Sequence, residues 1–256
     1  MNKFGKIAAL SIAAMMGIGM LSGCGADKGG TLTMATNAQF PPFEFVTEEG
    51  KGTVGQFDGI DVVIADKIAQ EAGKTLKVDD MSFEGIIASV ASGKADMGVA
   101  GMTVTPERQQ SVDFSDTYYT ASQSIVVAPD NTNITKAEDL KNNKKIGVVL
   151  GYTGDTICTD DLGISDSNLL RVKRGIDAVQ ELKNGKLDAV VIDSATAKAL
   201  SEKNGLKIVD DPEVFEKEEY AIAVKKGNQE LLNTINKVLA EMKANGEIEK
   251  LAQKYN

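Results

Sequence analysis

Short apolar segments alternate with longer amphipathic segments along the chain from Thr31 onward. In 60–72, for example, isoleucines recur at every fourth position, which places them on one face of a helix. Helices are expected over 60–72, 83–92, 106–112, 137–142, 176–183, 194–203 and 229–245, and strands over 32–35, 77–78, 97–100, 124–128, 146–150, 169–172, 189–192, 207–209 and 220–224. This alternation is typical of an α/β fold with largely parallel strands.

One sequence pattern occurs twice, in 86–99 and again 92 residues later in 178–191. Each copy has an amphipathic helical stretch, a glycine (Gly93 or Gly185), the triplet Lys-x-Asp and a small apolar strand. The glycine ends the helix because it takes a left-handed conformation that other residues adopt only at a cost. Such helix–glycine–strand joints are common in α/β proteins, but the repeated Lys-x-Asp favours two similarly wound lobes.

Two extended segments, 124–128 and 220–224, are predicted to cross between these lobes. An amphipathic helix follows the second crossing, and if it packs back on the first lobe the two crossings form a hinge. The expected order is lobe 1, hinge, lobe 2, hinge and a return to lobe 1, at 31–117, 118–123, 124–215, 216–220 and 221–256.

The first residues have the features of a secretory signal. Lys3 and Lys6 precede an apolar run of about 15 residues, which is shorter than the roughly 20 that a membrane-spanning helix needs. The run ends in Leu-Ser-Gly before Cys24, and this resembles the bacterial lipobox, in which the cysteine is acylated. We therefore expect a signal peptide over 1–23, a lipidated tether over 24–30 and a protein held on the outer face of a membrane; an uncleaved anchor with an incidental cysteine is the alternative.

Composition and charge exclude several function classes. The chain has 28 Lys and Arg against 37 Asp and Glu, a net charge of −9, which is the wrong sign for a nucleic-acid partner. It has no His and only two Cys, so a His/Cys zinc site and a His-based catalytic triad are both excluded. We expect no metal and no cofactor. Cys158, next to Ile157, is interpreted as a small buried residue rather than a reactive thiol.

In open parallel sheets, ligands bind beyond the carboxyl ends of the strands. After strand 97–100, Thr105 is a good N-cap and Pro106 suits the first helical position, so Arg108 falls in the first turn. A cation there opposes the helix dipole at a cost of about 0.3–1 kcal/mol unless an anion is present. Because helical side chains lean toward the N-terminus, Arg108 is aimed back at the loop 101–103; a solvated surface arginine is the alternative.

The corresponding ends of the second lobe carry two further candidates. The turn 151–155 leads from strand 146–150 into a helix whose free N–H groups suit a carboxylate, although an ordinary strand-to-helix connection has the same pattern. The turn lacks the ending of a P-loop, so a nucleotide is not expected. Asp193 ends strand 189–192, where it is either the N-cap of the next helix or the acceptor for an ammonium group. An Arg on one lobe and an Asp on the other are what an α-amino acid requires.

In lobe 1, strand 32–35 ends near Asn37, and Pro41 and Pro42 stiffen a turn that either presents Phe40 to a cleft or buries it in the core. At this point the chain closely resembles the polar amino-acid-binding, extracytoplasmic solute-binding proteins (family 3) of bacterial ABC importers. The segments that carry the resemblance cover residues 31–256 in order: Asn37–Phe45, Phe83–Ile87, Gly93–Asp96, Gly101–Arg108, Asp113–Asp116, Gly151–Gly154 and Asp188–Asp193.

The resemblance implies a periplasmic-binding-protein-like fold of two doubly wound α/β lobes on a two-strand hinge, which close around the ligand and dock on a permease with a cytoplasmic ATPase. It also implies roles for eight residues: Arg108, Thr103 and Thr153 at the ligand carboxylate, Asp193 and Gly101 at the ammonium group, Phe40 and Phe83 on either side of the side chain, and Asn37 at its far end. We expect a monomer.

Two departures from the family bear on the ligand. Several members that bind basic or amide side chains carry an acid at the position of Asn37, and polar residues are frequent at the position of Val149. A polar, uncharged or sulfur-containing L-amino acid is therefore favoured, with a basic amino acid as the alternative. A cyclohexadienyl-dehydratase-like enzyme would need a positioned general acid or base, which the absence of His disfavours, and a ligand-sensing receptor subunit would use the same ligand chemistry.

Overall fold

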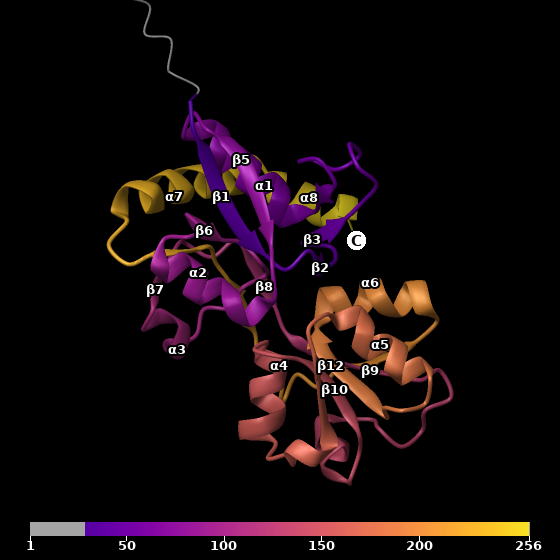
Figure 1. Cartoon of the computed structure of the whole chain (residues 1–256). Helices are drawn as coiled ribbons and strands as arrows, with labels where there is room; N and C mark the ends of the chain where they lie inside the picture. Colours follow the sequence, from indigo (N-terminus) through magenta and orange to yellow (C-terminus); the bar gives the residue numbers. More distant parts are fainter. Residues whose placement is uncertain (1–28, 256) are drawn as a thin grey trace, which may run out of the picture.

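The structure, a computed structural model, describes residues 29–255 (Figure 1). The predicted signal peptide, Cys24 and most of the predicted tether lie outside the described residues. The chain forms two lobes that are joined by crossing strands, and a five-stranded sheet lies at the centre of each lobe.

The sheet of lobe 1 contains three neighbouring parallel strands, a fourth strand antiparallel to them and a fifth, at the edge, that is antiparallel to the fourth. Their order is β5 (Thr75–Asp80), β1 (Thr31–Thr36), β6 (Met97–Gly98), β15 (Ala223–Lys225) and β7 (Val112–Phe114). The sheet of lobe 2 repeats this arrangement as β11 (Leu169–Val172), β10 (Ile146–Val149), β12 (Ala189–Asp193), β9 (Gln123–Val127) and β13 (Lys207–Val209). The two lobes are therefore wound alike, as the repeated sequence pattern predicted.

Helices cover both sheets and bury their apolar faces there. Those of lobe 1 are α1 (Ile60–Glu71), the 3₁₀ turn η1 (Phe83–Gly85), α2 (Ile86–Ser92), α3 (Pro106–Gln109), α7 (Gln229–Ala244) and α8 (Glu247–Tyr255). Those of lobe 2 are η2 (Ala137–Lys141), α4 (Thr153–Thr156), the π-helical η3 (Ile157–Asp161), η4 (Asp166–Asn168), α5 (Gly175–Lys183) and α6 (Ser194–Asn204). The last two helices, α7 and α8, pack against α1, so the C-terminal part of the chain returns to lobe 1 (Figure 1).

The lobes are connected through a pair of short antiparallel strands, β8 (Tyr119–Ala121) and β14 (Glu218–Tyr220). The two predicted hinge segments, 118–123 and 216–220, include these strands. The prediction that 124–128 and 220–224 are the crossings is wrong in detail. Strand β9 belongs to the lobe 2 sheet, and 220–224 is divided between β14 and β15, because each half pairs with a different partner strand.

One predicted element is shorter in the structure, and two further elements were not predicted. The helix expected over 106–112 ends at Gln109, because Val112 pairs with Lys225 in the sheet. Helix α8 and a small sheet formed by β2 (Gln39–Phe40), β3 (Glu44–Val46) and β4 (Phe57–Asp58) were not expected. The small sheet is relevant to function because it holds the turn that presents Phe40.

Cys158 is fully buried in the core of lobe 2, where burial and the nearby Asp155 raise the pKa of its thiol to about 12. Among the helices between residues 29 and 255, none combines the length and apolar character that crossing a bilayer requires. The same residues contain no group of three or more His, Cys, Asp and Glu side chains that is arranged to hold a metal ion.

Candidate ligand-binding site

The loop after β6 forms the floor of the site in lobe 1. Gly101 has a φ of +52°, and a Cβ atom at this position would lie 2.5 Å from Cε1 of Phe40, so only glycine fits there. The loop is hydrogen-bonded to the returning hinge strand: the Ala221 amide donates to the Met102 carbonyl at 3.0 Å, and the Val104 amide donates to the Glu219 carbonyl at 3.0 Å. The hinge therefore positions the loop directly.

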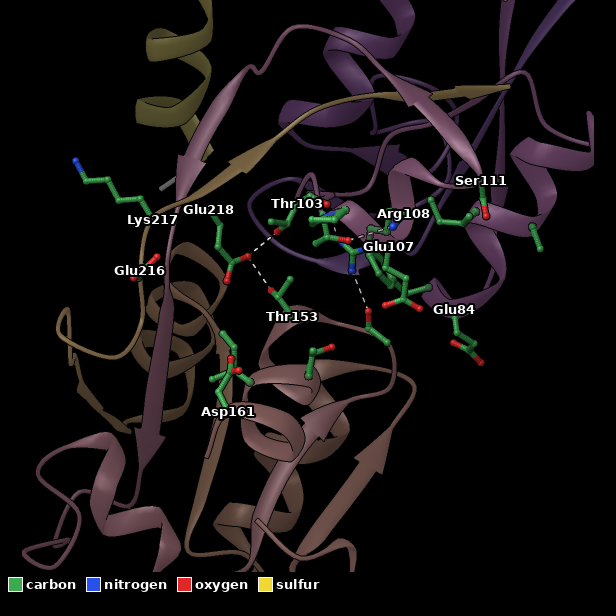
Figure 2. Close-up of a pocket in the computed structure, with 18 of the residues that line it drawn as sticks. Glu84, Thr103, Glu107, Arg108, Ser111, Thr153, Asp161, Glu216, Lys217 and Glu218 are labelled. Atoms are coloured by element: carbon green, nitrogen blue, oxygen red, sulfur yellow. Dashed lines mark hydrogen bonds between the residues drawn. The ribbon is translucent and has the colours of Figure 1, made fainter. Parts of the chain in front are cut away.

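Arg108 lies in the first turn of α3, where Thr105 is the N-cap and its hydroxyl accepts from the Arg108 amide at 3.2 Å. The guanidinium reaches back toward the loop, in the direction that its place in the helix predicted, and donates to the Thr103 carbonyl at 2.7 Å. It also donates to the Gly151 carbonyl of lobe 2 at 2.9 Å (Figure 2) and lies 5.1 Å from the centroid of the Phe83 ring. Arg108 thus contacts both lobes.

Asp193 enters the site from lobe 2, at the end of β12. It occupies the N-cap position of α6, but its side chain makes no capping hydrogen bond and instead accepts a hydrogen bond from the Tyr220 hydroxyl. Only 3% of the residue is exposed. Burial, together with the charge of Glu218, raises the pKa of Asp193 to about 7. A buried carboxylate of this kind gains most from a cationic partner.

The turn between β10 and α4 brings Thr153 to the same place. Asp155, two residues further on, forms a salt bridge of 2.8 Å with Arg171 of β11, which anchors the start of the helix. The Thr153 hydroxyl accepts from the side-chain amide of Gln123 at 3.0 Å and donates to the Glu218 carboxylate at 2.7 Å.

Glu218, on the hinge strand β14, was not predicted as a site residue. Its carboxylate accepts from the Thr103 hydroxyl of lobe 1 at 2.5 Å, from the Thr153 hydroxyl of lobe 2 at 2.7 Å and from the Gln123 amide at 3.0 Å. Figure 2 shows the two threonines converging on this carboxylate. Glu218 belongs to the charged run 216–219, a pattern typical of a solvated segment. Its burial follows from the pairing of β14 with β8, which the sequence pattern does not show.

Three aromatic rings meet at the site, two from lobe 1 and one from lobe 2. Tyr152 of lobe 2 is inserted between Phe40 and Phe83 of lobe 1, with ring centroids at 5.3 Å and 4.5 Å respectively. The Tyr152 hydroxyl points to Oδ1 of Asn37 at 3.4 Å, and the Asn37 side-chain amide donates to the Met81 carbonyl at 2.7 Å. Tyr152 lies inside the turn 151–154 that the sequence singled out, but it was not predicted as a site residue.

These groups line a small cavity between the lobes. It is lined by Phe40, Phe83, Ala100, Gly101, Thr103, Arg108, Tyr152, Thr153 and Asp193. Seven of the eight residues singled out from the sequence line it, and the eighth, Asn37, lies behind Tyr152. A wider cleft opens beside the cavity, where Glu84, Glu107 and Glu216 lie near Arg108 and Glu218 (Figure 2).

Residues 32–256 match the model of the bacterial extracellular solute-binding proteins, family 3. The chain belongs to this family. It is 36% identical over 251 residues to the arginine-binding extracellular protein ArtP of Bacillus subtilis, which covers 92% of each chain. It is 33% identical to a probable histidine-binding protein of Neisseria gonorrhoeae over 97% of this chain and 93% of the relative. Among solved structures, an ancestral arginine-binding protein bound to glutamine has 43% identity and a TM-score of 0.78, covering 89% of this chain and 98% of its own.

Membership in the solute-binding family confirms three predictions. The two-lobed periplasmic-binding-protein fold is that of the solved relatives. The extracytoplasmic location is that of the family. The relatives are named as binding proteins, and a solved structure with 40% identity and a TM-score of 0.80, covering 88% of this chain and 99% of its own, is the substrate binding protein of an amino acid ABC transporter. The interpretation of the chain as an amino-acid-binding component of an ABC transporter rather than an enzyme is therefore also confirmed.

Two further acids lie beneath the site of this solute-binding protein. Asp61, on α1, accepts from the Gly101 amide at 2.7 Å and from the Tyr118 hydroxyl at 2.8 Å, so it supports the binding loop and the start of the hinge. Burial raises the pKa of Asp61 to about 6. Glu44 is also fully buried, and burial together with the neighbouring Asp61 raises its pKa well above the usual value.

These acids predict that the protein without ligand is more stable at mildly acidic pH. A carboxyl group whose pKa is higher in the folded state than in the unfolded chain holds its proton longer when the protein is folded. The free energy of unfolding therefore falls as the pH rises from the pKa of the unfolded state to the pKa of the folded state. For Asp61 and Asp193 this loss extends from their unfolded values near 3.8 to about 6 and about 7. We expect the melting temperature at pH 5 to exceed that at pH 8 by about 5 °C or more.

Thermal unfolding of ligand-stripped protein, followed by circular dichroism, measures this difference. Asp193→Asn should reduce the dependence on pH, whereas Asp160→Asn, which alters an exposed acid, should leave it unchanged. A melting temperature that is flat or rises between pH 5 and pH 8 would contradict the assignment of these buried carboxyl groups.

Proposed function

We propose that this protein captures an L-amino acid between its lobes, on the outer face of a membrane, and delivers it to an ABC permease. One observation carries the proposal: Arg108 of lobe 1 and Asp193 of lobe 2 line the same small cavity. The pair matches the opposite charges of an α-amino acid, because a guanidinium binds a carboxylate bidentately and a carboxylate accepts from an ammonium group. Each charge of the ligand thus finds a partner on a different lobe.

Binding requires an exchange of hydrogen bonds. Arg108 now donates to the carbonyl groups of Thr103 and Gly151, and the ligand carboxylate takes over these donors. Thr103, Thr153 and the first amides of α4 complete the carboxylate site. Asp193 and the Gly101 carbonyl receive the ammonium group. Because the ligand then bonds to both lobes, it favours the closed arrangement over any open one, which is the condition for ligand-driven closure.

The side chain of the ligand lies between Phe40 and Phe83 and reaches toward Asn37. These three residues carry no charge, which favours a polar, uncharged or sulfur-containing side chain. A basic amino acid is the second candidate. A second acid, Glu218, lies directly behind the two threonines that line the cavity, and the named relatives include arginine- and histidine-binding proteins.

A thermal-shift screen tests the proposal. Residues 25–256 are purified, unfolded and refolded to remove carried-over ligand, then heated with each of the twenty L-amino acids, cystine and ornithine. A ligand at 100 times its Kd adds about 2.7 kcal/mol to the stability, which moves the melting temperature by several degrees. A hit among neutral or sulfur-containing amino acids supports the favoured class, one confined to Arg, Lys and ornithine supports the alternative, and no hit in the panel contradicts amino-acid capture.

The membrane attachment is proposed through a lipid on Cys24, with the chain otherwise a monomer. Cells that express the full chain are expected to incorporate a labelled fatty acid into wild-type protein and not into Cys24→Ser, and the wild type should sediment with membranes. Cys158→Ser is the matched control, because that thiol is buried in lobe 2. Equal labelling of the wild type and Cys24→Ser would contradict the lipid anchor.

A further inference from the structure

Tyr152 occupies the place between Phe40 and Phe83 where the proposed ligand side chain belongs. Its ring meets both phenylalanines edge to face, at interplanar angles of 89° and 65°, a favourable arrangement for aromatic pairs. Only 5% of Tyr152 is exposed, although it comes from a surface turn of the opposite lobe. Burial raises the pKa of its phenol well above the usual value, so the hydroxyl remains a donor.

The space that remains in the cavity is too small for a ligand side chain. Its volume is about 10 Å³, which is at the lower limit for a single water molecule. Because the Tyr152 ring contacts both phenylalanines, a ligand side chain can lie between them only if Tyr152 moves. The same rearrangement frees Oδ1 of Asn37, because the Tyr152 hydroxyl is the group that points to it.

We propose that Tyr152 is a built-in competitor for the side-chain subsite, which the ligand must displace in order to bind. The inference rests on the proposed function and adds a residue that determines affinity and side-chain preference. The fraction of molecules in which Tyr152 fills the subsite is not competent to bind, so the apparent Kd exceeds the intrinsic Kd in proportion.

The surroundings of Tyr152 allow it to move. Gly151, directly before it, has a φ of +83°, and the contact with Asn37 is long for a hydrogen bond between oxygen atoms. The wider cleft, lined by Gly151, Thr153 and Phe83 among others, begins next to the turn and provides room for the displaced ring. When Tyr152 moves, it loses its contacts with Phe40 and Phe83, and the ligand side chain replaces them with contacts of its own.

The groups that Tyr152 leaves behind indicate which side chains replace it best. Phe40 and Phe83 offer apolar edges, and Asn37 offers an acceptor, because its amide nitrogen already donates to the Met81 carbonyl. A side chain that matches Tyr152 has an apolar or flat body and a hydrogen-bond donor at its end, as in glutamine, histidine or arginine. A side-chain carboxylate, as in glutamate, offers no donor to Asn37 and faces an oxygen atom there.

Titration calorimetry with L-glutamine, L-histidine, L-arginine and L-glutamate tests the proposal on the wild type, Tyr152→Phe and Tyr152→Ala. For a ligand that the wild type binds, Tyr152→Ala is expected to bind about tenfold more tightly, since the competitor is gone. Tyr152→Phe, which keeps the ring and loses only the hydroxyl, should fall between the two. Tyr255→Ala removes a tyrosine that contacts Phe45 and Asp58, none of which lines the cavity, and should leave the affinity unchanged.

Equal or weaker binding by Tyr152→Ala, with wild-type binding intact, overturns the inference and leaves the proposed function standing. If neither the wild type nor any variant binds an amino acid, the proposed function itself fails. A second measurement, fluorine NMR of fluorotyrosine-labelled protein, does not depend on the alanine variant. The chain has five tyrosines, and the resonance that is missing from the spectrum of Tyr152→Phe belongs to Tyr152. When ligand saturates the protein, the chemical shift of that resonance is expected to move to the value of a solvent-exposed tyrosine. An unchanged chemical shift overturns the inference.

Discussion

Arg108→Ala is expected to weaken amino-acid binding by between about 30-fold and several thousandfold. Removing one partner of a buried charge pair costs roughly 2–5 kcal/mol, because the other charge remains desolvated without a partner. Here that charge is the ligand carboxylate, which would face Thr103, Thr153 and the Glu218 carboxylate with no cation beside it. Titration calorimetry with the ligand found by the screen measures the loss.

A matched arginine provides the control. Arg174 pairs with Asp177 at the surface of lobe 2, and Arg174→Ala should leave the affinity unchanged. Arg108→Lys should fall between alanine and the wild type, because lysine keeps the charge but lacks the planar pair of donors. Wild-type affinity in Arg108→Ala would show that the ligand carboxylate is bound elsewhere, and the site assignment would then be wrong.

Asp193→Asn is expected to cause a loss of similar size and also to change how binding depends on pH. Asp193 must be ionised to hold an ammonium group, yet its pKa is raised to about 7 by burial and by Glu218. Below that pH the ligand must first drive off a proton, so the Kd of the wild type is expected to rise about tenfold between pH 8 and pH 6. Ligand binding should correspondingly release protons at pH 6.

Calorimetry in buffers of different ionisation enthalpy counts these protons. In Asp193→Asn the remaining binding should no longer lose affinity between pH 8 and pH 6. A Kd that is constant over this range in the wild type would contradict the ammonium role of Asp193. A pH dependence that persists in Asp193→Asn would instead point to Asp61, whose pKa of about 6 lies in the same range and whose carboxylate holds the Gly101 amide.

Local rules were sufficient for much of the fold and for one decisive side chain. The spacing of isoleucines in α1 and the glycine that follows α2 predicted helices that the structure contains. Arg108 could be aimed from the sequence because Thr105 and Pro106 define the start of a helix, and helical side chains lean toward that start. The repeated Lys-x-Asp pattern predicted the similar winding of the lobes, because it comes from the same helix-to-strand joint in each.

The remaining site residues depend on contacts between distant parts of the chain. Glu218 lies 115 positions from Thr103, and Tyr152 lies 115 positions from Asn37, so no local periodicity connects them. The elevated pKa values of Asp61 and Asp193 arise from burial, which a sequence pattern does not measure. The helix expected to continue through Val112 ended early for the same kind of reason, since pairing with β15 outweighed local helix preference.

The sequence by itself therefore determined the fold class, the family resemblance and the charges offered to a ligand, because these depend on residue types and on spacing along one segment. Only the tertiary structure decided that Glu218 joins the two lobes and that Tyr152 fills the subsite between Phe40 and Phe83. Both depend on how the two lobes meet, and that arrangement follows from packing across the whole chain rather than from any one segment.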